Sequence, residues 1–172
     1  LMAVIEAIAT TYLEADAASV TFSGIPATYE HLQLRISVRS VYGGTGGDYF
    51  YVRLNGETSG SNQDQKLIIA NTSSISVLSA SGHIQVRRIP TAGLPATRYA
   101  SVLVECLDYA NTNKKPVVSL MSGTSGTDMN RLSFGSGMIT NSNAAVDSIS
   151  FIAANGSMTR GSSFTLYGLN SA

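Results

Sequence analysis

Apolar and polar residues alternate along much of the chain, which is the pattern of half-buried β-strands. Between His31 and Arg39, leucine, isoleucine and valine occupy every second position, and glutamine, arginine and serine occupy the positions between them. The stretch Asp48–Asn55 alternates in the same way, with Phe50 and Val52 on its apolar side. From this spacing we expect the two stretches to pair as a hairpin that turns one apolar face toward a core.

The opposite face of the expected hairpin carries arginine and tyrosine. These side chains combine apolar area with directional hydrogen bonds, and they are enriched where proteins meet proteins. We therefore interpret this face as a protein interface, with an ordinary solvated sheet face and a glycan-binding face as the alternatives. The chain contains no tryptophan to stack on a sugar ring, which disfavours the glycan alternative. The interface candidates are Arg35, Arg39, Tyr49, Tyr51 and Arg53.

Short strands separated by turn residues are predicted along the rest of the chain, about nine to eleven in all. Leu1–Leu13 suits a short helix or an opening strand, and the threonines and tyrosine near its end favour the strand. Lys66–Ala70 and Ser74–Leu78 are expected to form two edge strands or one broken strand. Arg98–Tyr109 is apolar on both faces, which indicates a central strand or one covered at an interface.

These patterns predict an all-β protein, an antiparallel β-sandwich, with under about a tenth of its residues in helix. We expect residues 1–16 to form an N-terminal strand or arm and residues 17–172 to form a single β-sandwich domain. The predicted core consists of Phe22, Leu34, Ile36, Phe50, Val52, Val102, Val104, Val118, Ile149, Phe151, Phe164 and Leu166.

Composition and charge narrow the range of partners. The chain of 172 residues has eleven basic and eleven acidic residues, and this balance disfavours a nucleic-acid binder. No apolar run approaches the roughly 20 residues that cross a bilayer, so we expect no membrane insertion. The opening segment holds Glu6 and lacks a basic leader, so it does not have the pattern of a signal peptide. The single cysteine excludes intrachain disulfides and a cysteine-rich zinc site.

Residues suited to catalysis are few. His31 and His83 alternate with strand residues and are expected on solvated faces, and Cys106 is expected as a small core residue. The chain has no nucleophile elbow, zinc-protease motif or phosphate-binding loop. The aspartates are scattered singly, without the spacing of a calcium loop, although a calcium site built from distant loops remains an alternative. We therefore predict a protein that is not an enzyme and needs no cofactor or metal.

Three segments resemble a family of tailed-bacteriophage virion proteins. They are Val4–Thr11 (VIEAIATT), Ala18–Arg35 (ASVTFSGIPATYEHLQLR) and Gly161–Leu169 (GSSFTLYGL). The resemblance spans nearly the whole chain, except for Thr58–Pro95. It implies a small jelly-roll-like β-sandwich that occurs as a capsid decoration (cement) protein or as a module of a tail fibre.

Two functions follow from the resemblance. One is a decoration protein that binds the outside of the head and bridges major-capsid subunits; the other is a tail-fibre or receptor-binding module that recognises a host surface glycan or protein. A fibre normally adds an attachment segment and a shaft, whereas here the sandwich fills Val4–Leu169, so we favour the decoration protein. A tail depolymerase is disfavoured, because no pair of carboxylates stands at a readable spacing.

The resemblance and the two apolar faces of Arg98–Tyr109 together predict a homotrimer on the virion surface. Several weak contacts held in one rigid trimer act together, because the first contact raises the effective concentration of the others to about the millimolar range. We expect the bridging contacts to come from a flexible Leu1–Asp16 and from the polar loops Glu57–Gln65 and Ser122–Asn130.

Overall fold

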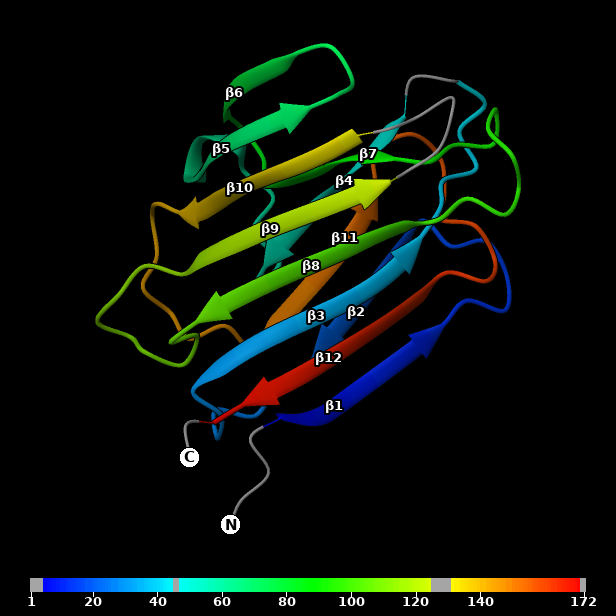
Figure 1. Ribbon diagram of the computed structural model, residues 1–172. Coiled ribbons are helices and arrows are strands. Elements are labelled where there is room, and N and C mark those ends of the chain that lie inside the picture. Colours follow the sequence, from blue (N-terminus) through cyan, green and yellow to red (C-terminus); the bar gives the residue numbers. More distant parts are fainter. Residues whose placement is uncertain (1–4, 45–46, 125–130, 171–172) are drawn as a thin grey trace.

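Two antiparallel β-sheets packed against each other make up the protein, which was analysed as a computed structural model that describes residues 5–44, 47–124 and 131–170 (Figure 1). These residues contain no α-helix and one short 3₁₀ turn, Gly60–Asn62. The expected all-β antiparallel sandwich is thereby confirmed. The strands are β1 (Ile5–Tyr12), β2 (Ser19–Ser23), β3 (His31–Val38), β4 (Asp48–Leu54), β5 (Gln63–Ala70), β6 (Ile75–Ser81), β7 (Gln85–Ile89), β8 (Ala100–Leu107), β9 (Val117–Thr124), β10 (Arg131–Ile139), β11 (Ser148–Ala153) and β12 (Ser163–Leu169).

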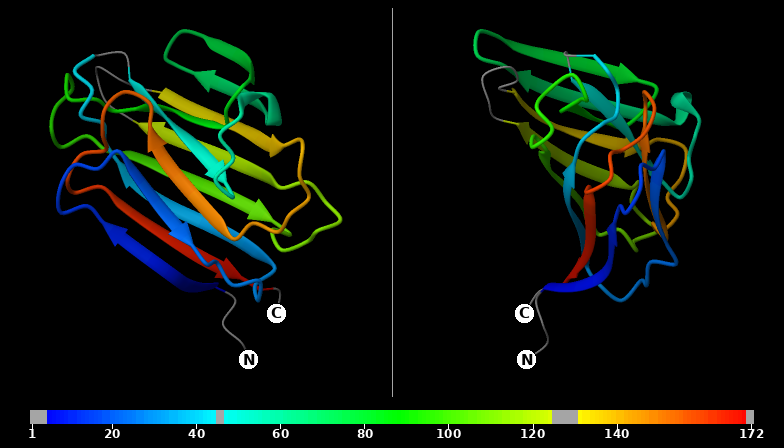
Figure 2. Two further views of the ribbon diagram at one scale, coloured as in Figure 1. Left: turned by 180° about the vertical axis from the view of Figure 1, so that it is seen from behind. Right: turned by 90° about the vertical axis from the view of Figure 1, so that its right-hand side faces the viewer.

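The larger sheet has eight strands in the order β1-β12-β3-β8-β9-β10-β5-β6, and the smaller has four in the order β2-β11-β4-β7. Seen from behind, the smaller sheet covers the middle of the larger one, while β5 and β6 lie to its side (Figure 2). Strand β8 lies inside the larger sheet, so the prediction of a central strand at Arg98–Tyr109 is confirmed. The strand prediction at the start of the chain is also confirmed, because Ile5–Tyr12 pairs with β12.

The predicted hairpin between His31 and Asn55 is wrong. Strand β3 pairs with β12 and β8 in the larger sheet, and β4 pairs with β11 and β7 in the smaller one. The two strands therefore face each other across the core instead of lying edge to edge. Alternation establishes that each strand has one apolar face, but a sandwich and a hairpin both satisfy that requirement, and the long connection after β3 is free to cross between sheets.

The core lies between the two sheets, and all twelve predicted core residues are buried. Strands β3, β8 and β12 contribute one wall, and β2, β4 and β11 contribute the other. At the centre the rings of Phe151 and Phe164, one from each sheet, lie with centroids 5.9 Å apart at a tilt of 46°. Cys106 is fully buried in the same core, as the sequence predicted.

A polar seam joins β7 to the larger sheet. The Gln65 side-chain amide donates to the Gln85 carbonyl (2.7 Å) and its oxygen accepts the Gln85 backbone N–H (3.0 Å). Gln63 accepts the N–H of Ile84 in the same manner (3.3 Å). The hydroxyl of Ser122 donates to the Arg87 carbonyl (2.7 Å). These side chains supply β7 with hydrogen bonds that a neighbouring strand would otherwise make.

The seam corrects two predictions about loops. Glu57–Gln65 was expected to be a polar loop without a core residue, yet Gln63 and Gln65 are buried at the start of β5. Ser122 was placed in a loop and is a buried residue of β9, which continues to Thr124. A hydropathy pattern assigns polar residues to the surface, but such residues are stable in the interior when their hydrogen-bonding groups are satisfied. The remainder of the second loop, 125–130, lies outside the described residues.

The expectation of a flexible N-terminal segment is likewise wrong for part of its length. Residues 5–12 form strand β1, and its pairing with β12 holds it at the edge of the larger sheet. It cannot reach outward as a free arm while that pairing persists.

Two phenylalanines test the assignment of the core. Phe164 is fully buried, whereas Phe134 on β10 is 55% exposed. We expect Phe164→Ala to lower the free energy of unfolding by about 3–5 kcal/mol, because it leaves a cavity between the sheets. Phe134→Ala is the matched control and should change it by less than about 0.5 kcal/mol in the dilute protein. Urea unfolding followed by circular dichroism measures both, and similar losses in the two variants would contradict the assignment.

The polar seam makes a second prediction. Gln65→Leu keeps the size of the side chain but leaves the N–H and C=O of Gln85 without these partners. We expect the substitution to lower the free energy of unfolding by about 1–3 kcal/mol, the usual cost of an unsatisfied buried polar group. Asp64→Asn, at the exposed neighbouring position of the same strand, is the control. Equal stability of the two variants in urea unfolding would show that the seam contributes nothing.

Candidate protein interface

The five candidate interface residues do not form one face. Arg35 lies on the outer face of the larger sheet, while Tyr49, Tyr51 and Arg53 lie on the outer face of the smaller sheet. The physical reason is the separation of β3 and β4 into different sheets. Two distinct outer faces therefore replace the single arginine and tyrosine face that the sequence predicted.

Arg39 lies inside the molecule, with 7% of its surface exposed. Its Nη2 donates to the carbonyl oxygens of Thr91 (3.0 Å) and Leu94 (2.8 Å). The guanidinium thus fastens the segment between β7 and β8 to the end of β3. This arrangement gives Arg39 a structural role and leaves little of it to an external partner.

The smaller sheet carries a cluster of aromatic and cationic side chains. The rings of Tyr49 and Tyr51 pack edge to face with centroids 5.7 Å apart, and His83 lies 4.6 Å from Tyr51. The guanidinium of Arg87 stands 5.1 Å above the Tyr49 ring, a cation–π geometry. Burial and the hydrogen bond to Tyr49 raise the pKa of Tyr51, although Arg53 and Arg87 act in the opposite direction. The half-buried cluster therefore presents the neutral phenol of Tyr51 beside positive charge at neutral pH.

The outer face of the larger sheet is polar where β3, β8 and β12 meet. The Arg35 Nε donates to the Gln33 side-chain oxygen (2.8 Å), and the Gln33 amide donates to the Glu105 carboxylate (2.8 Å). The Arg35 guanidinium also lies 4.8 Å from the centroid of the Tyr167 ring. Arg35 is thus held by its own sheet neighbours in a network that extends over three strands.

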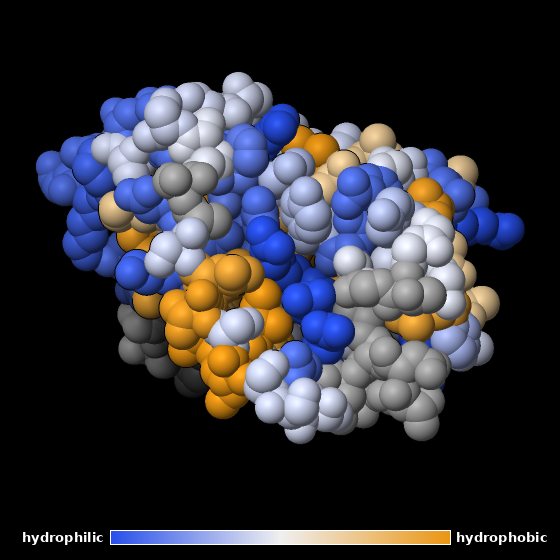
Figure 3. Space-filling model, turned by 90° about the horizontal axis from the view of Figure 1, so that it is seen from above, coloured by the Kyte–Doolittle hydropathy of each residue, from blue (hydrophilic) through white to orange (hydrophobic). Residues whose placement is uncertain are grey.

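The same face is apolar over β5, β6, β9 and β10. In the sheet register Phe134 stands opposite both Ile68 and Met121, and Ile68 stands opposite Val77. Figure 3, which looks down on the β5 and β6 end of the molecule, shows apolar side chains gathered there. We call this area the outer apolar patch. Its six members are about half exposed or more: Ile68, Ile75, Val77, Met121, Leu132 and Phe134.

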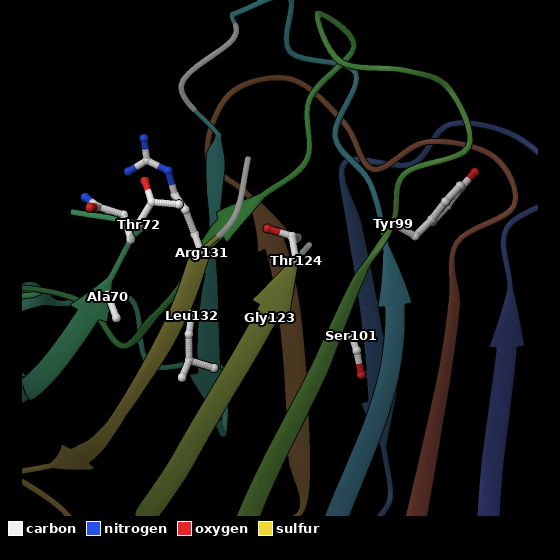
Figure 4. A pocket seen from close by; sticks show the side chains of 9 residues that line it. Ala70, Thr72, Tyr99, Ser101, Gly123, Thr124, Arg131 and Leu132 are labelled. Carbon is white, nitrogen blue, oxygen red and sulfur yellow. The ribbon is translucent and has the colours of Figure 1, made fainter. Parts of the chain in front are cut away.

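Shallow hollows surround the outer apolar patch. One of about 320 Å³ lies beside Ile68, Val77 and Phe134. Another, of about 470 Å³, opens between the end of β8 and the ends of β9 and β10 (Figure 4). In that view Tyr99 points away from Arg131, and its hydroxyl donates to the Arg160 carbonyl (3.0 Å). The second hollow therefore lacks an aromatic platform directed into it.

The sequence pattern alone did not predict the outer apolar patch, because we expected the large apolar residues of each strand to face the core, and in β10 most of them face outward. Its inward positions from Ser133 to Gly137 are small, namely Ser133, Gly135 and Gly137, and the large apolar residues Leu132 and Phe134 point outward; Ile139, at the end of the strand, returns to the core. A Cβ on Gly137 would lie 2.7 Å from the Ile84 side chain, so the approach of β7 leaves no room for a larger residue. The regular alternation of Leu132 and Phe134 with serine and glycine was the available signal.

The reactive side chains are dispersed. His31 accepts the Asp108 backbone N–H through Nδ1 (3.1 Å), and His83 belongs to the tyrosine cluster of the other sheet. Burial raises the pKa of the Cys106 thiol to about 12. Among residues 5–44, 47–124 and 131–170, no three histidine, cysteine, aspartate or glutamate side chains are grouped to hold a metal ion. In the same residues no helix has the length and apolar character to cross a membrane.

Cys106 should be chemically inert in the folded protein. With a pKa of about 12 against an ordinary 9.0, its thiolate fraction is about a thousandfold lower than in the unfolded chain. We expect iodoacetamide at pH 8 to label it far more slowly in buffer than in urea, with mass spectrometry as the readout. Comparable labelling rates would show that the thiol is accessible, and a reactive role for it would then have to be considered.

Comparisons with known proteins supply little further information. No protein-family model matches the chain, and no curated protein matches it. Among solved structures, a protein of unknown function from Shewanella oneidensis MR-1 is similar with 10% identity and a TM-score of 0.27, over 98% of this chain and 77% of that one. A chain of the infectious bursal virus derived T=1 particle has 12% identity and a TM-score of 0.13, over 96% of this chain and 40% of that one. Both scores are too low to carry an argument.

Proposed function

We propose that this chain is a structural protein of a bacteriophage virion, a capsid decoration protein that binds the outside of the head and bridges major-capsid subunits. The observation that carries the proposal is the outer apolar patch. Contiguous exposed apolar areas of this kind are rare on soluble monomers and mark sites of protein association. The resemblance of three segments to tailed-phage virion proteins suggests that the particle is a phage virion. The outer apolar patch offers a surface by which the chain could attach to it.

The distribution of side chains supports a binding role over a catalytic one. The outer apolar patch lies on the outer face of the larger sheet, and the hollow beside Ile68, Val77 and Phe134 is lined mainly by small and apolar residues. A flat apolar area rimmed by polar groups such as Lys66 and Ser119 has the anatomy of a protein interface. An enzyme would instead bring several titratable side chains together in one concave site.

In this proposal the chain acts as a homotrimer, with each copy touching more than one capsid subunit. Strand β1 is held in the sheet, so the bridging contacts fall to the sheet faces and the connecting loops. Glu57 keeps one such connection ordered by accepting hydrogen bonds from the Ser59 N–H (2.7 Å) and the Asn62 amide (3.1 Å). These bonds, the Ser59 N–H first, lower the pKa of Glu57. An ordered connection costs less entropy on binding than a flexible one.

The alternative, a tail-fibre module that binds a host glycan or protein, has no comparable support from the geometry. Glycan sites commonly stack a sugar against an exposed aromatic ring. Tyr99, the aromatic residue beside the hollow of about 470 Å³ at the end of β8, points away from Arg131 and donates its hydroxyl to the Arg160 carbonyl. We therefore retain the decoration protein as the proposal.

Heating capsids tests the proposal directly. Capsids of the phage that encodes the chain are stripped of it, reconstituted with the purified protein, and heated while release of DNA is recorded with a dye. We expect reconstituted capsids to open at a higher temperature than stripped ones. Phe134→Asp should remove most of that gain, because it places a charge in the outer apolar patch, whereas Leu107→Asp, elsewhere on the same face, should not. Identical opening temperatures with and without wild-type protein would refute the decoration role.

A further inference from the structure

Sheet edges are sites of association, because each exposes a row of unpaired N–H and C=O groups. The described residues form four such edges, and three of them are protected. Strand β1 has an irregular register between Ala7 and Ala9. Strand β2 is only five residues long. Strand β7 is met by side chains of the larger sheet and carries Arg88 in a left-handed conformation (φ 68°). Irregular register, short length and covering groups all oppose the addition of another strand.

Strand β6 has none of these protections. It holds no charged residue, proline or glycine between Ile75 and Ser81, and its register with β5 is unbroken. Ile75 and Val77 are 75% and 67% exposed, the highest values among the large apolar side chains of the described residues. A straight, uncharged and apolar edge strand is the type that associates with another strand in water.

The hydrogen bonds around β6 show which backbone groups are free. The Asn71 N–H donates to the Ser74 carbonyl (3.0 Å) and the Gly82 N–H to the Gln63 carbonyl (3.2 Å), which sets the phase of the β5–β6 ladder. Hydrogen-bonded and non-hydrogen-bonded pairs alternate along an antiparallel ladder. The backbone N–H and C=O groups of Ser76, Leu78 and Ala80 therefore point toward β5. The groups of Ile75, Val77 and Ser79 therefore point away from the sheet, along the free edge.

We propose that β6 pairs antiparallel with β6 of a second copy of this chain, about a two-fold axis at Leu78. Antiparallel pairing of identical strands is self-complementary, so one edge supplies both halves of the ladder. With the axis at Leu78, all seven residues of β6 are paired, and Val77 of one copy faces Ser79 of the other. The absence of charge on β6 means that two copies do not repel each other there.

The pairing also joins the two outer apolar patches. Val77 stands at the edge of a row that continues through Ile68 and Phe134 on the outer face. When two β6 strands pair, the two rows meet at the junction and form one apolar surface across a continuous sheet. The Val77 side chains of the two copies, which are diagonal neighbours across the axis, then shield one another from water, which adds apolar burial to the hydrogen bonds of the ladder.

This inference goes beyond the proposed function and does not depend on it. A two-fold contact makes an assembly with an even number of chains. In the decoration protein it would link single chains into dimers or link neighbouring trimers across their rims. The same contact would form in a protein with any other function, because it depends only on the residues and the exposed backbone groups of β6.

Crosslinking tests the pairing. Leu78→Cys places a thiol on the proposed axis, where the Cα atoms of a facing non-hydrogen-bonded pair are about 4.5 Å apart. The only native cysteine, Cys106, is buried and does not compete. Leu107→Cys, an exposed position on β8, is the matched control. Under mild oxidation we expect most of the Leu78→Cys chains to run as a covalent dimer on a non-reducing gel, with at least about tenfold more dimer than the control.

Light scattering supplies the second measurement. We expect the wild-type protein at tens of micromolar to have the mass of an even-numbered assembly, and Val77→Lys to halve that mass because it sets like charges at the paired edge. Leu107→Lys should leave the mass unchanged. Equal crosslinking at positions 78 and 107, or a Val77→Lys mass equal to wild type, would overturn the pairing. Capsid stabilisation by the wild-type protein is judged separately, so a stable odd-numbered assembly that still protects capsids refutes only the pairing.

Discussion

The apolar contact between the two sheets is the interaction on which the rest of the molecule depends. Phe151 from the smaller sheet and Phe164 from the larger one meet there, and buried aliphatic residues of both sheets surround them. The chain has a single cysteine, so no intrachain disulfide joins the two sheets. Strands β3 and β4 contribute their apolar faces to this contact from opposite sides of the core.

The end of the sandwich near β7 is built on a different principle. There the two sheets approach so closely that glycine and serine line the inside of β10, and glutamine side chains from β5 bond to the backbone of β7. Since the inner positions of β10 from Ser133 to Gly137 are small, Leu132 and Phe134 occupy its outer face. The outer apolar patch is thus a consequence of how the sheets meet inside the molecule, and the same feature supplies the surface that we propose to bind a partner.

The two outer faces suit different tasks. The larger sheet offers the patch and the unprotected edge of β6, both of which are adapted to apolar association. The smaller sheet offers a half-buried cluster of Tyr49, Tyr51 and Arg87 in which rings and guanidinium hold one another in place. A protein with two such faces on a rigid sandwich can contact more than one neighbour at a time, which is what bridging on a particle surface requires.

The alternation of apolar and polar residues was sufficient to predict strands, the all-β class and the twelve core residues, because a half-buried strand must turn every second side chain inward wherever it lies. It could not identify the neighbour of each strand, so β3 and β4 were paired and Arg35 was joined to Tyr49 on one face. Burial of Arg39, Gln63 and Gln65 was equally hidden, since a polar residue is stable inside only when hydrogen-bond partners from distant segments reach it. The need for a small residue at Gly137 was set by the close approach of the Ile84 side chain to β10, a distance that only the tertiary structure contains.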